Sequence, residues 1–335
     1  MSSQTETTTI AVVYNPVRID VPKVQTALEN AVSALPSTEL LWLATTAEDP
    51  GFGQTKQALE AGASVVIAAG GDGTVRPVAE TVRDTTTALG IIPTGTGNLL
   101  ARNLNLPLND VDAACEVALN GVTRSIDVGV TTLWRENDEQ STNDFLVIAG
   151  IGIDAHMIAN TNPDLKRRVG WIAYVDAGLR SLKRARKIHA RFSVDDGPWR
   201  SARVSSLLFA NCALLPANIE LIPDSAVDDG LLDIVVLQPA SFLGWLAIWR
   251  AVTWENRVLR KSSLGRRIVR LNDKSRRTHM NYLRGSHVRV HLERPEPFQL
   301  DGDSCGDVTR LEIRVDAGGL RVRVPAEFEE NSSEN

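Results

Sequence analysis

Short apolar runs and segments of helical periodicity alternate along the first third of the chain. The apolar runs occupy residues 10–14, 40–44, 65–69 and 89–92. Helical spacing of apolar residues marks the segments 22–34, 55–61 and 75–83. Continuous apolar runs are typical of strands that helices cover on both faces. The alternation therefore predicts a parallel sheet, in which ligands bind beyond the carboxyl ends of the strands.

The pattern changes after residue 122, where short strand-like runs follow one another with turns between them. These runs are 125–132, 145–149, 188–194, 204–210, 232–237, 288–292, 311–315 and 320–324. So many strands with few helices predict an antiparallel β-sandwich. Two helices are expected to interrupt it, at 168–184 and 241–259, and the polar segment 131–144 reads as an exposed hairpin loop.

A chain of 335 residues is longer than one hydrophobic core usually serves, which favours two domains. We predict a flexible N-terminus at 1–9, an α/β domain at 10–122, a β-sandwich domain at 123–325 and a flexible acidic tail at 326–335. The fold class is therefore α/β plus β. An apolar share of 43% excludes disorder, collagen and coiled coil as descriptions of the whole chain.

Charge is distributed unevenly along the chain. The formal net charge is -5, yet the Lys and Arg residues concentrate in segments 166–191 and 257–294, which carry +8 and +10 and leave -23 for the remainder. Such segregation is typical of a surface that faces an anionic partner, although a merely solvated basic face is the alternative. We expect an anionic membrane surface and no nucleic acid, because aromatic-interleaved RNA motifs are absent.

The expected location is the cytoplasm, with transient association with a membrane. The first residues lack the basic and apolar regions of a signal peptide, and the longest apolar stretch, 242–249, is too short to span a bilayer. Three widely spaced cysteines favour a reducing compartment. Segment 241–254 places three tryptophans among aliphatic residues, so docking at a lipid interface and internal packing both stay open. A homodimer and a monomer stay open as well.

Two glycine-rich loops carry the strongest chemical signal. Gly70-Gly71-Asp72-Gly73-Thr74 follows the predicted strand 65–69 and opens a helix, an arrangement that suits a phosphate group. Asp72 would repel a bare phosphate and so favours an accompanying cation, most simply Mg²⁺. Pro93-Thr94-Gly95-Thr96-Gly97-Asn98 follows the strand 89–92. Loops at the carboxyl ends of two strands in one sheet can converge on one ligand.

The motifs GGDGT and PTGTGN in this order resemble the catalytic domain of the diacylglycerol kinase family, which includes soluble bacterial lipid kinases and, more remotely, sphingosine and ceramide kinases. Shorter agreements extend from residue 10 to 325. They are Asn15-Pro16, residues 126–129, residues 150–154, Lys166 with Gly170 and Tyr174, Asn211, residues 229–231 and residues 300–303. The resemblance implies an N-terminal domain similar to those of NAD kinase and phosphofructokinase. It also implies Mg²⁺-dependent transfer of phosphate from ATP to a lipid hydroxyl, most simply that of diacylglycerol, in the cleft between two domains.

Carried over by position, the resemblance assigns roles to particular residues. Asp303 matches the family's base, and Asp301 lies two residues before it, so that in a strand both would share a face. One of these two catalytic carboxylates could bind Mg²⁺ while the other deprotonates the substrate. Asp127 and Lys166 are expected near substrate or phosphate, and a Mg²⁺ is expected at Asp229 with the carbonyl groups of Ala226 and Leu231. The expected nucleotide-binding residues are Asn15, Thr45, Gly70, Gly71, Asp72, Gly73, Thr74, Val75, Arg76, Pro77, Gly95, Thr96, Gly97 and Asn98.

The chain departs from the family pattern in three places. Asp303 stands where Glu is usual, Arg76-Pro77 replaces a common Asn-Glu, and Val17-Arg18 replaces a Ser-Gly. The alternatives are therefore a kinase acting on another lipid, such as phosphatidylglycerol or a sphingoid base, or a non-catalytic nucleotide- or lipid-binding homologue. An NAD kinase fits less well because of the PTGTGN loop.

Overall fold

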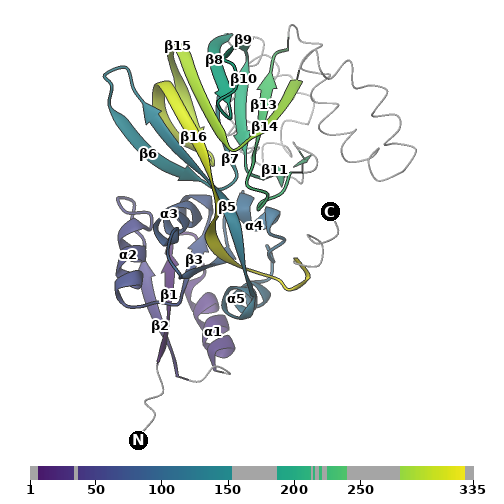
Figure 1. Ribbon diagram of the computed structural model, residues 1–335. Helices are drawn as coiled ribbons and strands as arrows, with labels where there is room; N and C mark the ends of the chain where they lie inside the picture. Colours follow the sequence, from purple (N-terminus) through teal and green to yellow (C-terminus); the bar gives the residue numbers. More distant parts are fainter. Residues whose placement is uncertain are drawn as a thin grey trace, which may run out of the picture. The chain divides into compact units, whose positions relative to one another are not determined.

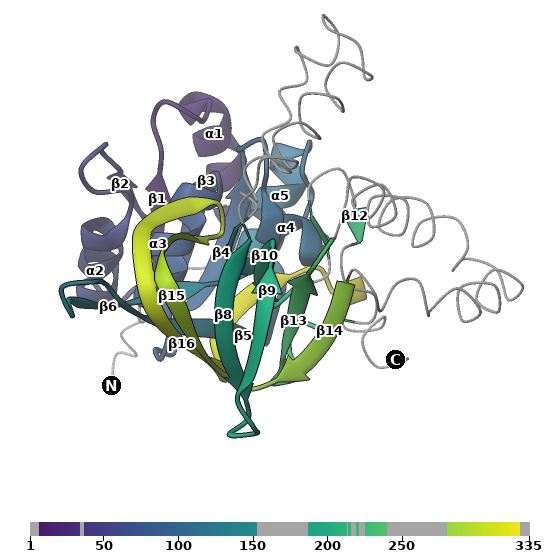
Figure 2. The same cartoon turned by 90° about the horizontal axis from the view of Figure 1, so that it is seen from above.

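The computed structural model describes residues 7–33, 37–152, 187–212, 214–215, 219–220, 225–239 and 280–328. The chain divides into two compact units, each described by itself below. Unit 1 comprises Met1–Val128 with Ala317–Asn335, and unit 2 comprises Gly129–Asp316. Two long strands, β5 (Val122–Trp134) and β16 (Asp303–Val324), contribute to both units (Figures 1 and 2).

Unit 1 is built on a parallel sheet, as the alternating pattern predicts. Its strands, in the spatial order β2-β1-β3-β4, are β1 (Thr8–Tyr14), β2 (Thr38–Ala44), β3 (Val65–Gly70) and β4 (Ala88–Pro93). The helices are α1 (Val21–Val32), α2 (Phe52–Glu60), α3 (Asp72–Val82), α4 (Leu99–Asn103) and α5 (Val111–Asn120). Figure 1 shows these helices around the sheet. Every residue of β3 and β4 is buried, which explains their continuous apolar sequences.

Local sequence signals begin the two helices that cover one face of this sheet. The Asp20 side chain accepts a hydrogen bond from the Lys23 N–H group at 3.2 Å at the start of α1, where proline also occupies the first turn. Asp110 caps α5 in the same way, through the Ala113 N–H group at 3.0 Å. Buried residues of α1 and α5 pack with those of β1 and β3 in one cluster. The caps fix where the helices begin, and the cluster packs them against the sheet.

The C-terminal segment of the described chain belongs to unit 1. The prediction instead placed residues 123–325 together in the second domain. Val322 of β16 pairs with Leu89 of β4 in parallel. The carboxylate of Asp127, which is only 1% exposed, accepts a hydrogen bond from the Gly318 N–H group at 2.8 Å. The predicted strands 311–315 and 320–324 are a single strand. Its continuity lets the chain leave unit 2 and re-enter unit 1.

Unit 2 is a β-sandwich in which every described strand pairing is antiparallel. Its further strands are β6 (Gln140–Phe145), β7 (Ile148–Ile151), β8 (Ile188–Val194), β9 (Arg200–Val204), β10 (Ser206–Ala210), β11 (Leu214–Leu215), β12 (Ile219–Glu220), β13 (Leu232–Leu237), β14 (Met280–Gly285) and β15 (His287–Leu300). Phe145, Phe209 and Phe298 are fully buried in its core. The antiparallel sandwich predicted from the short runs is thus confirmed.

Several details of unit 2 differ from the expectation. The segment 131–144, predicted as a loop, is mostly the β5–β6 hairpin, in which Thr131 pairs with Asn143 and Trp134 with Gln140. The predicted strand at 145–149 is two strands. Two further strands were not predicted: β9 is largely polar, and in β14 apolar residues are mixed with Asn, Arg and Gly. The helices expected at 168–184 and 241–259 lie outside the described residues. Within the described part of the chain, no helix is both long and apolar enough to span a membrane.

Candidate active site

The first glycine loop turns directly from strand β3 into helix α3. Gly71 is the N-cap residue of α3, and its carbonyl oxygen accepts hydrogen bonds from the N–H groups of Thr74 and Val75 at 2.9 and 3.0 Å. A Cβ atom on Gly70 would lie 2.7 Å from the Thr74 hydroxyl oxygen, so the turn has no room for a side chain there. The N-terminus of α3 therefore lies at the carboxyl end of β3, and the first N–H groups of a helix have no partner within the helix.

The second glycine loop connects strand β4 to helix α4, and Asn98 closes it. Asn98 adopts the left-handed conformation, with φ of 47°, which Asn tolerates better than most residues. Its side-chain oxygen accepts a hydrogen bond from the Gly95 N–H group at 3.0 Å, and its side-chain amide donates to the Gly95 carbonyl at 2.8 Å. These reciprocal bonds fix the shape of the loop without a ligand.

The two loops pack against each other. A Cβ atom on Gly95 would lie 2.6 Å from the Gly71 Cα atom. The Asp72 carboxylate of the first loop accepts a hydrogen bond from the Leu99 N–H group, just after the second loop, at 2.6 Å. A Cβ atom on Gly97 would lie 2.5 Å from that same carboxylate. The glycines are therefore needed for the close approach of the two loops.

The ends of the other two strands contribute to the same edge. Asn15 directly follows β1, and its N–H group donates to the Ala69 carbonyl at 3.1 Å. Thr45 directly follows β2, is buried, and donates its N–H group to the Tyr14 carbonyl at 2.8 Å. Since β1, β2, β3 and β4 are parallel, all these segments lie at the carboxyl edge of one sheet. The candidate nucleotide-binding residues thus gather in unit 1.

Sequence reasoning did not single out Thr94, which lies within the second loop. Its hydroxyl oxygen is buried without a hydrogen-bond partner among the described residues, while its N–H group donates to the Gly70 carbonyl at 3.0 Å. A buried polar group normally has a partner. An unpartnered hydroxyl between two glycine loops is a signal that only the structure supplies. Thr96, which was predicted, is exposed.

Arg76 and Pro77 belong to α3. Pro77 lies inside the helix and is buried. The Arg76 guanidinium lies 3.7 Å from the Glu80 carboxylate one turn later, and these side chains are 14% and 20% exposed. Arg76 is therefore partly held by its own helix.

Asp301 lies in a hairpin turn and Asp303 directly follows that turn, which corrects the expectation that they share a face of one strand. Leu300 pairs with Asp303 across the end of the β15–β16 hairpin, leaving Asp301 and Gly302 as the two turn residues. Both have positive φ, 48° and 96°, as a type I′ hairpin turn requires. Asp and Gly are favoured in such a turn, so local backbone geometry explains part of this motif.

The two carboxylates have different surroundings. That of Asp301 accepts hydrogen bonds from the backbone N–H groups of residues 146, 147 and 148 at 2.7, 2.9 and 2.9 Å. The Asp301 N–H group also donates to the Ile148 carbonyl at 2.8 Å. Asp303 is exposed at the start of β16. Asp301 therefore fixes the turn to the β6–β7 connection, and Asp303 is the carboxylate presented to solvent.

Asn211, another residue of the resemblance, binds carbonyl groups of the same connection. It is buried, and its side-chain amide donates to the Leu146 carbonyl at 3.1 Å while its N–H group donates to the Val147 carbonyl at 2.9 Å. Residues 146–148 are thus fixed by both Asn211 and Asp301. The agreement of Asn211 and Asp301 with the family pattern therefore has a structural explanation within unit 2.

Asp127 and Lys166 are the residues expected near substrate or phosphate. Asp127 is almost fully buried and binds the Gly318 N–H group. Its carboxylate therefore stabilises β16 within unit 1. Lys166 lies outside the described residues.

The predicted metal residues form a turn before β13. One Asp229 oxygen accepts a hydrogen bond from the Leu231 N–H group at 3.0 Å, and the other lies 3.6 Å from the Arg284 guanidinium. Gly230 has φ of 72°. One carboxylate with the carbonyl oxygens of Ala226 and Leu231 is an all-oxygen donor set, which suits Mg²⁺ in chemistry. In the described ranges, no group of three or more His, Cys, Asp or Glu side chains is arranged to hold a metal.

Comparison with known proteins identifies the protein family to which the two units belong. The Diacylglycerol kinase catalytic domain matches residues 10–131, and the YegS C-terminal NAD kinase beta sandwich-like domain matches residues 147–324. Both units thus correspond to known domains of one class of kinases. The chain belongs to the diacylglycerol kinase and YegS-like lipid kinase family.

Individual relatives agree with this assignment. The chain is 31% identical over 277 residues to a "Probable lipid kinase YegS-like" of Pseudomonas fluorescens, covering 81% of this chain and 80% of that protein. It is 27% identical over 244 residues to the diacylglycerol kinase of Bacillus subtilis, covering 72% of each. A 29% identical protein of Synechocystis without an assigned role is matched over 79% of this chain but only 56% of its own length.

Solved structures show the same fold at lower identity. A diacylglycerol kinase from Bacillus anthracis gives a TM-score of 0.66 at 18% identity, covering 97% of this chain and all of that one. An NAD kinase from Archaeoglobus fulgidus in complex with ATP gives a TM-score of 0.50 at 12% identity, covering 97% of each chain. At these identities the likeness establishes the fold alone.

Proposed function

We propose that this protein transfers the γ-phosphate of ATP to a lipid hydroxyl group, most simply converting diacylglycerol to phosphatidic acid. The observation that carries the proposal is the contact between the two glycine loops at one sheet edge, held by the Asp72–Leu99 hydrogen bond. Membership of a lipid kinase family and the diacylglycerol kinase of Bacillus subtilis as a relative support the lipid acceptor.

In this proposal the phosphates of ATP lie on the glycine loops. The first turn of α3 presents backbone N–H groups and the positive end of the helix dipole, and glycines leave the backbone open to a close approach. Asn15, Thr45 and the hydroxyl of Thr94 add polar groups along the same edge. The ATP complex of an NAD kinase with a similar fold supports this choice of nucleotide.

Asp303 acts as the general base of the proposed reaction. Its exposed carboxylate accepts the proton of the lipid hydroxyl while the hydroxyl oxygen bonds to the γ-phosphorus. The bond between that phosphorus and the β–γ bridging oxygen breaks, and ADP leaves. Mg²⁺ would pair with the negative charge that develops on the phosphate oxygens, and Asp229 with its neighbouring carbonyls is the proposed protein site for a further ion. Asp301 keeps the base in position through the hairpin turn.

A kinase assay with matched variants tests this function. Purified protein is incubated with labelled ATP, Mg²⁺ and a panel of diacylglycerol, phosphatidylglycerol and sphingoid bases, with NAD as a further acceptor. We expect a labelled lipid, and a loss of about 100-fold or more in turnover for Asp303→Asn, since general bases commonly contribute that much. The matched control is Asp307→Asn, an exposed carboxylate on the same strand that should leave turnover unchanged.

The outcomes separate the alternatives. Phosphorylated NAD without phosphorylated lipid would replace the lipid kinase by an NAD kinase. ATP binding without transfer to any acceptor would make the chain a non-catalytic binding protein. Asp303→Glu restores the usual family residue and should retain turnover; turnover that survives Asp303→Asn would remove Asp303 from the role of base.

A further inference from the structure

Three neighbouring strands of unit 2 place two arginines and a histidine in one row across the sheet. His291 of β15 pairs with Arg191 of β8 on one side and with Arg310 of β16 on the other. Val290 and Leu311, next to them in sequence, are buried in the sandwich core. Because side chains alternate between the faces of a strand, the row points away from that core.

Aromatic rings and a third arginine complete this surface, which we call the arginine face: Arg191, Arg289, His291, Arg310 and Trp199. Trp199 is 40% exposed, and its ring lies edge-on to His291 with centroids 4.8 Å apart. The guanidinium groups of Arg191 and Arg289 lie 5.8 and 5.6 Å from the centroid of the same ring. Guanidinium groups at these distances are favourably placed over an aromatic face.

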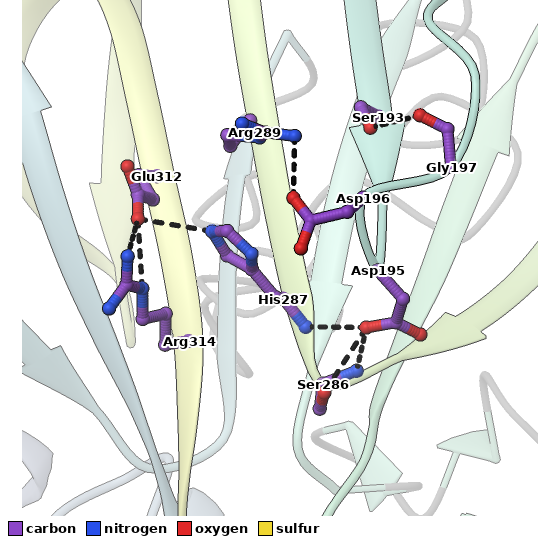
Figure 3. A network of polar contacts seen from close by, with 9 residues as sticks. All are labelled: Ser193, Asp195, Asp196, Gly197, Ser286, His287, Arg289, Glu312 and Arg314. Carbon is purple, nitrogen blue, oxygen red and sulfur yellow. Dashed lines mark hydrogen bonds and ion pairs between the residues drawn. The ribbon is translucent and has the colours of Figure 1, made fainter.

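The nearby carboxylates only partly balance this charge. As Figure 3 shows, Asp196 binds Arg289 at 2.7 Å, whereas Glu312 is occupied by His287 and Arg314. Glu293 pairs with His189 at 3.0 Å. Within the described residues, Arg191 and Arg310 form no ion pair with a carboxylate.

Burial and the same positive charge lower the pKa of the His291 imidazole. Arg310, Arg191 and Arg289 act by repelling the protonated form. The carboxylates of Glu312, Glu293 and Asp196 do not reverse this effect. The arginine face is therefore a site of positive potential next to a partly exposed indole ring.

We propose that the arginine face docks this protein on an anionic lipid bilayer. Guanidinium groups bind phosphate oxygens through two parallel hydrogen bonds, and an exposed Trp is favoured at the headgroup boundary. A membrane fits better than RNA because single-stranded RNA requires open aromatic faces for stacking. Although Trp199 is 40% exposed, the guanidinium groups of Arg191 and Arg289 already lie over its ring, and the Arg310 guanidinium lies 4.3 Å from the Trp134 ring centroid.

Sedimentation with vesicles tests the proposal. Full-length protein without nucleotide is mixed with vesicles of phosphatidylcholine alone or with phosphatidylglycerol added. We expect binding to the anionic vesicles only, weakening as salt rises. The double variant Arg191→Gln/Arg310→Gln should lower the partition coefficient roughly 10- to 30-fold, the effect of two basic residues near an anionic surface. The matched control, Lys23→Gln/Lys56→Gln, removes two exposed charges from α1 and α2 and should bind as the unchanged protein does.

A second double variant distinguishes loss of positive charge from loss of folding. Arg191→Lys/Arg310→Lys retains the charge and should restore most of the binding if the Gln variant is folded, which its circular dichroism will show. Equal binding of the Gln variant and the unchanged protein, or equal binding to both kinds of vesicle, would overturn the proposal. So would binding of a single-stranded oligonucleotide that the Gln variant loses while vesicle binding persists. Because the assay contains no ATP, its failure is distinguishable from a failure of the proposed kinase activity.

Discussion

The carboxylate of Asp72 and the backbone N–H group of Leu99 are 2.6 Å apart, so the glycine loop after β3 is joined to the start of the helix after the second loop. A hydrogen bond to a charged acceptor in a partly buried place contributes more than a neutral one. The loops are therefore held together by the protein itself. This relationship holds the proposed nucleotide-binding edge in shape, and it can be tested by changing either loop.

Asp72→Asn should weaken this junction while preserving its shape. We expect a loss of about 1–3 kcal/mol in the free energy of unfolding, because the acceptor loses its charge. Affinity for a fluorescent ATP analogue should fall as well, since the loops would no longer be fixed. Urea unfolding and nucleotide titration measure the two effects. Glu48→Gln, an exposed change in the same unit, is the control; equal stability of Asp72→Asn and this control would contradict the assigned contact.

Gly95→Ala and Gly73→Ala should affect stability in opposite directions. A methyl group on Gly95 would lie 2.6 Å from the Gly71 Cα atom, which forces the loops apart and should cost about 1–3 kcal/mol. A methyl group on Gly73 meets nothing within 4 Å and lies in helix α3, where Ala is favoured over Gly by up to about 1 kcal/mol. Thermal unfolding compares the two variants, and a destabilised Gly73→Ala would contradict this helix geometry.

Substitutions of the two aspartates at the β15–β16 turn should have different effects: one should lower stability, and the other should lower turnover without changing stability. Asp301→Ala removes the acceptor of three backbone N–H groups, and leaving buried donors unpaired costs about 1–3 kcal/mol for each group that finds no water. Asp303→Asn, at an exposed position, should change the free energy of unfolding by less than about 0.5 kcal/mol. Urea unfolding and kinase assays of both variants measure the two effects. An Asp301→Ala protein of unchanged stability would mean that these three bonds are not structural anchors.

The sequence predicts the parts of this molecule that depend on neighbouring residues. Apolar runs and glycine spacing are local, and they indicated the parallel sheet, its loops and the sandwich. The contact of Asp301 with Leu146 spans 155 positions and leaves no trace in spacing. The same holds for the pairing of Val322 with Leu89. Polar strands such as β9 escape notice because nothing in their composition separates them from loops.

The thiol of Cys115 provides a test that is independent of function. Burial raises its pKa to about 12, and the nearby Asp112 carboxylate adds to the effect by repelling a thiolate. In the native protein at pH 8, a disulfide reagent should therefore modify the partly exposed Cys305 and leave Cys115 unmodified until denaturant is added. Mass spectrometry of the labelled peptides identifies the sites.

The same shift predicts how stability depends on alkaline pH. The folded protein keeps the Cys115 proton up to about pH 12, whereas the unfolded chain releases it from about pH 9. The unfolded state therefore binds fewer protons in this window, and the stability that Cys115 contributes falls as the pH rises through it. Urea unfolding measures the free energy of unfolding of each protein relative to its own value at pH 8. Above pH 9 this free energy should fall more steeply for the unchanged protein than for Cys115→Ala. If the free energy of unfolding depended on pH in the same way in both proteins, the Cys115 thiol would not be shielded in the native fold.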